Sequence, residues 1–190
     1  GRINETVNEL RMLAKDAGLY YKDNKGTKCF DQKQWEAIKA WTTLSKDKKI
    51  DKKAARNMVK YIRELEDPAF RSDKFWRAEP DLRDYDFQTL KEWCGLTLED
   101  NQKNKPWYWK LRRNFKLKQI RHFIRLLRRY GQKELDTDPL ITIDTIHSVK
   151  GGEANHVVLY SKGNYPSDYA NKNKQEKSDE RKVWYTGATR

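Results

Sequence analysis

The sequence predicts an α/β protein that is rich in helices and contains a small parallel sheet. Three observations lead to this prediction. Amphipathic segments with helical spacing fill most of the first 130 residues. Two β-branched, mostly apolar runs of strand length follow, at 140–144 and 156–160. The second run has the pattern of a strand that is buried on both faces, which is typical of a parallel sheet.

The composition is that of a folded and strongly basic chain. Among its 190 residues are 41 Lys or Arg and 28 Asp or Glu, so the formal net charge is +13. Mean hydropathy is −1.11, but 7 Trp, 10 Tyr and 6 Phe supply enough aromatic area for a modest core. The excess of positive charge favours a polyanionic partner, and nucleic acid before a membrane surface.

Several classes of protein are excluded by what the sequence lacks. It has no apolar run near the roughly 20 residues of a membrane-spanning helix. Its first residues lack the apolar core of a signal peptide, so we expect a cytoplasmic protein. The cysteines and histidines have no metal-ligand spacing, so no metal site is expected. Cys29 and Cys94 are expected to be free thiols.

The first 45 residues are predicted to form two helices separated by an extended piece and a turn. Apolar residues at helical spacing predict a helix over 5–17. An extended piece at 19–21 leads into a turn at 23–28, which is rich in residues that tolerate positive φ. A second helix is expected over 31–44, with an aspartate as its N-cap.

The next part of the chain is predicted to contain two shorter helices and a loop between them. Asp51 is expected to cap a helix whose apolar stripe extends to Leu65. Two prolines and the lack of a clean period predict a loop with one short turn at 67–84. A short helix that begins near Phe87 is expected to end at Gly95.

The segment from Lys103 to Arg129 carries the strongest compositional signal. It contains eleven Lys or Arg residues and no Asp or Glu. Its pattern predicts an amphipathic helix with a cationic side that binds DNA. The predicted apolar stripe comprises Leu117, Ile120, Phe123, Ile124 and Leu127. The predicted cationic side comprises Lys116, Arg121, Arg125, Arg128 and Arg129, of which Arg121, Arg125 and Arg128 are candidate DNA contacts.

Three aromatic residues, Trp107, Tyr108 and Trp109, precede that helix. They can stack on bases, at roughly 1–3 kcal/mol per base. They can equally fill the small core of the helical region. The scarcity of other apolar residues there favours the core.

Three segments carry the functional signal. One is T-I-H-S-V-K-G-G-E-A at 145–154, between the predicted strands; another is D-E-R-K-V-W-Y-T-G-A-T-R at 179–190; the third is R-I-N at 2–4, before the first helix. Adjacent glycines allow close backbone approach to a phosphate or a sugar. An arginine beside such a site can stabilise the charge of a transferring phosphoryl group. Each motif alone is weakly specific.

Taken together, the order and spacing of these segments resemble motifs V, VI and IV of the UvrD/Rep/PcrA-type superfamily 1 DNA helicases. The resemblance implies that 1–45 and 137–190 form the second RecA-like domain, with a partial RecA-like parallel sheet, and that 46–136 form a basic, mainly helical inserted subdomain. It further implies the C-terminal portion of an ATP-dependent 3′–5′ helicase that moves on single-stranded or partly duplex DNA.

The resemblance also implies roles for residues at the nucleotide. Arg190 and Arg2 resemble the arginines that contact the γ-phosphate of ATP, and they are the candidate catalytic residues. Glu153 resembles the carboxylate that holds the ribose. Gly151 and Gly152 belong to the same nucleotide-facing loop, where the second glycine replaces the usual apolar residue.

Thr145, His147 and Lys150 resemble motif V residues at single-stranded DNA. The sequence contains no G-x-x-x-x-G-K-[ST] motif. We therefore expect the first RecA-like domain to be a partner outside this chain, and ATP and Mg²⁺ to be cofactors of the full-length enzyme only. The fragment alone is expected to be inactive.

Two alternatives remain open at this point. One is a non-catalytic basic nucleic-acid-binding module on a helicase-like scaffold. The other is the helicase part of a helicase-nuclease.

Overall fold

The chain divides into two compact units in the computed structural model. The structure describes residues 3–62, 65, 67–78, 84–94, 96, 105–145, 148 and 156–158. The discontinuous unit comprises Gly1–Cys29 and Leu135–Arg190, and the inserted unit comprises Phe30–Glu134. The sequence placed the first boundary after residue 45. The structure assigns the helix over 32–44 to the inserted unit, because this helix packs against the next one.

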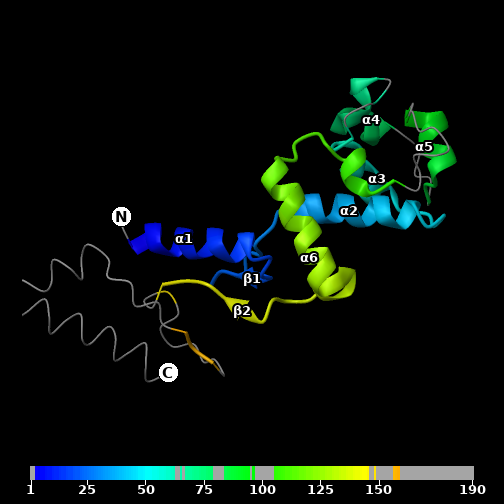
Figure 1. The fold of residues 1–190 in the computed structure, drawn as a ribbon. Helices are drawn as coiled ribbons and strands as arrows, with labels where there is room; N and C mark the ends of the chain where they lie inside the picture. Colours follow the sequence, from blue (N-terminus) through cyan, green and yellow to red (C-terminus); the bar gives the residue numbers. More distant parts are fainter. Residues whose placement is uncertain are drawn as a thin grey trace, which may run out of the picture. The chain divides into compact units, whose positions relative to one another are not determined.

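The discontinuous unit begins with helix α1 (Ile3–Asp16), drawn in blue in Figure 1. Gly18 has a φ of 65° and follows the helix end. Its N–H donates to the carbonyl of Lys15 at 3.1 Å, and the next N–H, of Leu19, donates to the carbonyl of Ala14 at 2.8 Å. These two bonds form a Schellman cap, in which glycine accepts the left-handed conformation without a Cβ penalty. The predicted helix over 5–17 is confirmed.

Two short strands, β1 (Tyr21–Lys22) and β2 (Ile141–Thr142), form a parallel pair. Tyr21 lies opposite Ile141, and Lys22 lies opposite Thr142. A bond from the N–H of Ile143 to the carbonyl of Lys22, at 3.0 Å, extends the pairing. The sequence prediction of a parallel sheet made from distant segments is confirmed for this pair. That the sheet is RecA-like stays a prediction.

The structure describes residues 156–158 of the second predicted strand, 156–160, and these three residues do not form a strand. Residues 156–158 have no strand conformation, and Val158 is 94% exposed. The prediction of a strand buried on both faces is therefore wrong for these three residues. The two strands of the described sheet pair with each other, and neither of them provides a partner for residues 156–158.

A tight turn connects the end of β1 to Lys28, which pairs with Lys22 of the strand. The Oδ1 atom of Asp23 accepts hydrogen bonds from the N–H groups of Lys25, at 2.9 Å, and Thr27, at 2.8 Å. Gly26 takes a φ of 80°, which glycine adopts readily. Lys22 and Lys28 close the turn as an antiparallel bridge. The predicted turn at 23–28 is confirmed.

The inserted unit is built from helices and short 3-10 turns (Figure 1). Its elements are α2 (Gln32–Leu44), α3 (Lys52–Val59), η1 (Pro68–Arg71), α4 (Asp73–Ala78), α5 (Phe87–Cys94), η3 (Trp107–Trp109) and most of α6 (Leu117–Asp136). Asp31 caps α2 by accepting from the N–H of Gln34 at 2.9 Å. Asp51 caps α3 by accepting from the N–H of Ala54 at 2.7 Å. Both N-caps were predicted, and both are confirmed.

Aromatic side chains form the core of the inserted unit. Trp35, Trp41, Trp76, Tyr85 and Phe123 are all buried. The rings of Trp35 and Phe123 stack with their centroids 6.4 Å apart. The indole N–H of Trp76 donates to a backbone carbonyl of η1 at 2.6 Å. Large rings therefore compensate for the low aliphatic content, as the composition suggested.

Two predictions for this unit need correction. Helix α3 ends at Val59 and not near Leu65, because the chain turns to pair Ile62 with Leu111 in an antiparallel bridge. That pairing takes the residues after Val59 out of the helix. The part of the predicted loop that the structure describes at 67–78 also contains η1 and α4, and α4 buries Trp76 in the core.

The chain returns to the discontinuous unit at the end of α6. The hydroxyl of Tyr20 donates to the carbonyl of Leu135 at 3.0 Å and to that of Thr137 at 2.6 Å. The ammonium of Lys28 donates to the same two carbonyls at 3.2 and 2.7 Å. Carbonyls at a helix C-terminus have no partner within the helix, and a cation there is favourable.

Cys29 is buried and free. Burial raises the pKa of its thiol, so the thiol is a poor nucleophile at neutral pH. No helix in the described part of the chain is long and apolar enough to cross a membrane. The same residues include no group of three His, Cys, Asp or Glu that could hold a metal ion.

Candidate functional site

The loop that follows β2 is organised around the carboxylate of Asp144. This residue lies just after the carboxyl end of the strand, and only 10% of its side chain is exposed. The next residue, Thr145, begins the loop in which sequence analysis placed DNA contacts. An ionised carboxylate offers about four acceptor positions, so it can hold several donors at once.

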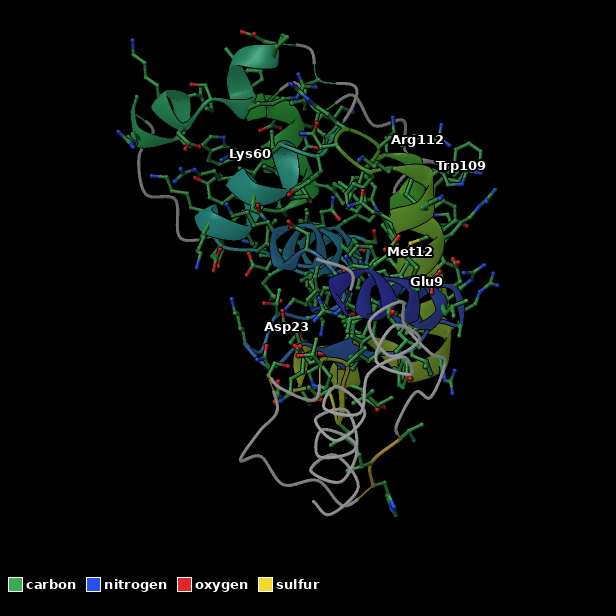
Figure 2. All side chains as sticks on the ribbon, turned by 90° about the vertical axis from the view of Figure 1, so that its left-hand side faces the viewer. Glu9, Met12, Asp23, Lys60, Trp109 and Arg112 are labelled. Atoms are coloured by element: carbon green, nitrogen blue, oxygen red, sulfur yellow. The ribbon has the colours of Figure 1, made fainter. Side chains whose placement is uncertain are left out.

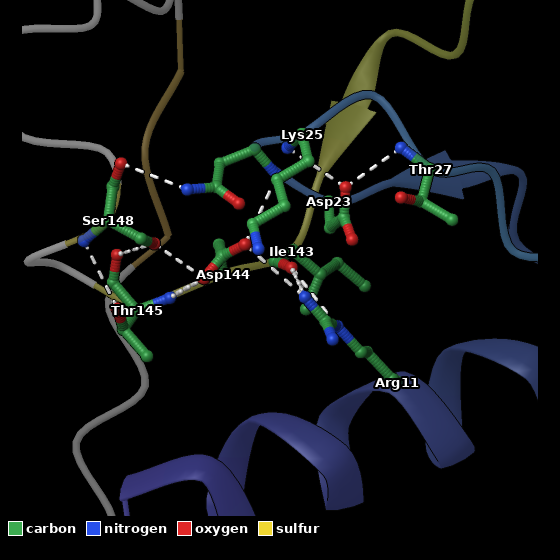
Figure 3. Close-up of polar contacts among 9 residues, drawn as sticks. Arg11, Asp23, Lys25, Thr27, Ile143, Asp144, Thr145 and Ser148 are labelled. Carbon is green, nitrogen blue, oxygen red and sulfur yellow. Dashed lines mark hydrogen bonds and ion pairs between the residues drawn. The ribbon is translucent and has the colours of Figure 1, made fainter.

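Figure 3 shows the donors that surround Asp144. Oδ1 accepts from the N–H of Thr145 at 2.7 Å and from the hydroxyl of Ser148. Oδ2 accepts from the N–H of Asn24 at 3.1 Å and from the guanidinium of Arg11 at 3.3 Å. These donors come from the loop itself, from the turn after β1 and from α1. One carboxylate therefore joins three segments that are distant in the sequence.

Arg11 contacts both the side chain and the backbone at the start of this loop. Its Nε and Nη2 atoms donate to the carbonyl oxygen of Ile143 at 3.3 and 3.1 Å. Nη2 also forms the ion pair with Asp144. The hydroxyl of Tyr21 donates to the backbone carbonyl of Arg11 at 3.1 Å. The planar guanidinium has several donors in a fixed geometry, so it can hold two acceptors together.

Short-range bonds give the loop its shape. The N–H of Ser148 donates to the hydroxyl oxygen and to the carbonyl of Thr145, both at 3.1 Å. The side-chain amide of Asn24 donates to the carbonyl of Ser148 at 3.2 Å. The Thr145 hydroxyl thus accepts one bond and retains its own proton as a donor. This arrangement is suited to contact a phosphate oxygen.

The same contacts keep Asp144 ionised. Burial alone would raise the pKa of this carboxyl. Hydrogen bonds from Ser148, Asn24 and Thr145, together with the charge of Arg11, act in the opposite direction and lower it. The net effect is a lowered pKa, so Asp144 is an anion at neutral pH. We assign it a role in holding the loop and none as a proton donor.

A second candidate surface lies on α6 in the inserted unit. Lys118, Arg121, Arg125 and Arg128 are exposed, and their spacing of three, four and three residues places them on one side of the helix. The five residues of the predicted cationic side are all exposed, but Lys116 precedes α6, and the row of four on the helix includes Lys118, which was not predicted. We refer to these four residues as the cationic stripe.

The apolar side of α6 differs from the predicted one. Phe123 and Leu126 are buried, together with His122. Leu117, which was expected in the stripe, is 62% exposed, and Leu126 is fully buried in place of Leu127. The reason is that the helix packs around the Phe123 ring, which stacks on an aromatic ring of α2.

The aromatic triplet before α6 divides between the two alternatives that the sequence left open. Trp107 is 7% exposed and packs against Phe115 and Phe123, with ring centroids 5.5 and 6.1 Å apart. Trp109 is 58% exposed. The ammonium of Lys105 lies 5.8 Å from its ring centroid. Trp107 is therefore part of the core, as the sequence favoured, whereas Trp109 is not.

A family model for the UvrD-like helicase C-terminal domain matches residues 3–190. The chain belongs to this helicase family. The match covers residues of both units, and it confirms the resemblance that was based on the three motifs. Searches of curated proteins and of solved structures found no match.

Most of the predicted nucleotide and DNA residues of this UvrD-like domain lie outside the described residues. They are Arg2, Arg190, Glu153, Gly151, Gly152, His147 and Lys150. Their roles stay predictions. The structure does describe Thr145, in the loop after β2, and Arg121, Arg125 and Arg128, on the cationic stripe.

Sequence reasoning missed the residues that hold the loop of this UvrD-like domain. Arg11, Asn24, Asp144 and Ser148 were not among the candidates. Asp144 and Ser148 carried a local signal, because Asp, Ser and Thr within four residues often bond to nearby backbone groups. The pairing of Arg11 with Asp144 spans 133 residues. Nothing local in the sequence could have predicted that pairing.

Proposed function

We propose that this chain is the C-terminal portion of an ATP-dependent 3′–5′ DNA helicase, and that it contributes two surfaces that contact DNA. The first is the loop at 144–148 in the discontinuous unit. The second is the cationic stripe of the inserted unit. The match to the helicase family over residues 3–190 is the observation that carries the proposal.

The described residues of the loop, Asp144, Thr145 and Ser148, support the proposal because polar contacts from several segments hold them. Their backbone bonds are fixed by Asp144 from within and by Arg11 and Asn24 from other segments. Residues that are held in place before binding lose less conformational freedom when they contact a DNA backbone. Thr145 presents a hydroxyl donor from such a loop, and hydroxyl donors are common contacts to phosphate oxygens.

The cationic stripe supports the proposal through its charge. No acidic residue occurs between Lys103 and Arg129. Phosphate contacts by lysine and arginine release counterions from DNA, and this release supplies most of non-specific binding. A stripe of four exposed cations on a helix that is anchored in the core therefore has the features of a backbone-tracking surface.

The nucleotide part of the proposal rests on motif order alone. In it, Arg2 and Arg190 face the phosphates of ATP, and Glu153 holds the ribose. ATP with Mg²⁺ would bind mainly to a first RecA-like domain that these 190 residues do not contain.

The DNA-binding part is tested with the chain itself and a fluorescein-labelled oligothymidylate of about 20 nucleotides. Anisotropy titrations between about 50 and 200 mM salt give the slope of log K against log salt, which is about −0.7 per phosphate contacted on single strands. A triple variant, Arg121→Glu, Arg125→Glu and Arg128→Glu, is expected to bind more weakly and to show a shallower slope.

The matched control makes the same change of charge elsewhere on the inserted unit. Lys46, Lys48 and Lys49 are exposed, and they lie outside the acid-free segment. Their replacement by Glu lowers the net charge equally and is expected to leave the slope nearly unchanged. Equal effects of the two triple variants would show that net charge alone acts, and would remove the cationic stripe from the proposal.

The catalytic part is tested by phosphate release. The chain alone, with ATP, Mg²⁺ and single-stranded DNA, is expected to release no phosphate above the protein-free rate, because it has no phosphate-binding P-loop sequence. DNA-stimulated ATP hydrolysis by the isolated chain would contradict the proposal that ATP binds mainly to a first RecA-like domain outside these 190 residues.

A further inference from the structure

Trp109 differs in exposure from the other tryptophans whose side chains the structure describes. Five tryptophan side chains are described, and Trp35, Trp41, Trp76 and Trp107 are each at most 7% exposed, whereas Trp109 is 58% exposed. Every other aromatic ring that flanks α6 at its start belongs to the packed cluster around Phe123 or borders it. The exposure of Trp109 is therefore not a consequence of a poorly packed region.

The turn that carries Trp109 is rigid. The N–H of Trp109 donates to the carbonyl of Pro106 at 3.0 Å, and the N–H of Leu111 donates to that of Trp107 at 2.9 Å. Trp107 is anchored in the core on one side of the turn, and Leu111 is fully buried after it and bridges to Ile62. Three residues complete a turn of 3-10 helix, so Trp107 and Trp109 leave it in different directions.

Two cations lie at the exposed ring or on the turn that carries it. The ammonium of Lys105 lies 5.8 Å from the Trp109 ring centroid. The Nε of Arg112 donates to the carbonyl of Tyr108 at 3.3 Å, which holds this exposed guanidinium against the turn. Figure 2 shows Trp109 and Arg112 at the outer surface of the inserted unit.

We infer that Trp109 is a stacking platform for one base of single-stranded DNA, and that Lys105 and Arg112 hold the phosphates on either side of that base. A flat indole face on a rigid turn, within a segment free of acids, matches the two requirements of single-strand binding: a π surface for the base and cations for the backbone. The inference rests on the proposed DNA binding and adds a base contact to its phosphate contacts.

Stacking and phosphate contact have different signatures, so the inference can be separated from the proposed function. Stacking depends on the base and hardly on salt, whereas phosphate contact depends on salt and not on the base. The probes are a labelled oligothymidylate and an abasic oligonucleotide of the same length. The variants are Trp109→Ala, Trp109→Phe and Trp109→Leu in the 190-residue chain, with Leu117→Ala as a control at another exposed apolar position.

We expect Trp109→Ala to weaken oligothymidylate binding roughly 5- to 150-fold, the range for loss of one stacked base. The salt slope should stay the same, and binding of the abasic oligonucleotide should not change. Trp109→Phe should retain most of the affinity. Trp109→Leu should lose it, because leucine keeps apolar area but has no π face. Leu117→Ala should have no effect.

Each other outcome counts against one specific claim. If the unaltered chain binds with a steep salt slope but Trp109→Ala binds equally well, the stacking platform is overturned while the cationic stripe stands. If Trp109→Ala weakens both oligonucleotides alike, the indole acts on the phosphates or on the fold, and stacking is again overturned. If the unaltered chain binds neither probe, both claims fail. Circular dichroism and the thermal midpoint establish that each variant is folded.

Discussion

The two candidate DNA surfaces are built in opposite ways. The loop after β2 is held by polar contacts between segments that are more than a hundred residues apart, centred on Asp144. The cationic stripe is held by apolar packing, because the opposite side of α6 is anchored through Phe123 in an aromatic core. One surface depends on a few directional bonds, and the other depends on buried area.

Because of this difference, the two surfaces tolerate different substitutions. A polar network fails when one member is removed, since the remaining buried groups lose their partners. A helix stripe on a packed core tolerates changes among its exposed charges but not among its buried rings.

Phe123→Ala should have the largest effect and should be confined to the inserted unit. Replacing a buried phenylalanine by alanine costs about 3–5 kcal/mol of the free energy of unfolding. Amide hydrogen exchange should therefore accelerate over α2 and α6 and change little in the discontinuous unit. Leu117→Ala, on the exposed side of the same helix, should change stability by less than about 0.5 kcal/mol. Equal acceleration of amide exchange in both units would contradict the claim that the Phe123 core supports the inserted unit alone.

Removal of the Asp144 carboxylate should have the next largest effect, in the discontinuous unit. Asp144→Ala leaves Arg11 and the loop N–H groups without their acceptor, at a cost of about 1–3 kcal/mol. A double-mutant cycle with Arg11→Ala should show a coupling of about 0.5–3 kcal/mol. The readout is amide exchange and unfolding of each variant.

Asp138→Ala is the control for that cycle. Asp138 pairs with Lys22 in the same unit, but 69% of its side chain is exposed, and exposed ion pairs contribute little. Additive effects of the Arg11 and Asp144 substitutions would show that the loop is held by something other than this contact.

Acidification should have the smallest effect on folding stability. The effect of salt on this pH dependence should differ between the two units. The pKa of Asp144 is lowered by its hydrogen bonds and by Arg11, although burial opposes the shift. The pKa of Asp73, in the inserted unit, is lowered to about 2 by its contacts with Lys60 and Arg56. A carboxyl whose pKa is lower in the folded state stabilises the fold above the unfolded pKa of about 4, and this stabilisation is lost as pH falls below it.

The inserted unit should therefore lose the contribution of Asp73 between about pH 4 and pH 2, and the discontinuous unit should lose that of Asp144 as pH falls below about 4. Asp73→Asn should flatten this dependence in the inserted unit, as measured by the unfolding midpoint against pH. Salt should weaken the contribution of Asp73 more than that of Asp144, because Asp73 is the more exposed and the more screened of the two. The reverse order would contradict the contrast between a buried network and surface charges.

Local spacing in the sequence was sufficient for most helices and for the cationic stripe. Asp31 and Asp51 mark helix starts because an N-cap acts within three residues of itself. Arg121, Arg125 and Arg128 could be placed on one side of α6 because helix geometry fixes that side once the helix is known. The family could also be inferred, since motif order along the chain survives without any knowledge of contacts.

Predictions from local spacing failed where contacts between distant residues determine the structure. The end of α3 depends on the bridge between Ile62 and Leu111, and the residues at 156–158 are not the buried strand that their apolar pattern suggests. The rotation of α6 follows from the Phe123 ring in its aromatic cluster. An apolar pattern states that residues prefer burial, but not which neighbour buries them.

Helix positions, charge and family are thus encoded by residues close together in the sequence, because capping, helical period and motif order are short-range properties. The ion pair of Arg11 with Asp144 and the divergence of Trp107 from Trp109 came only from the tertiary structure. Both depend on which distant segments meet, and the free energy that selects those partners is a property of the packed chain rather than of any one segment.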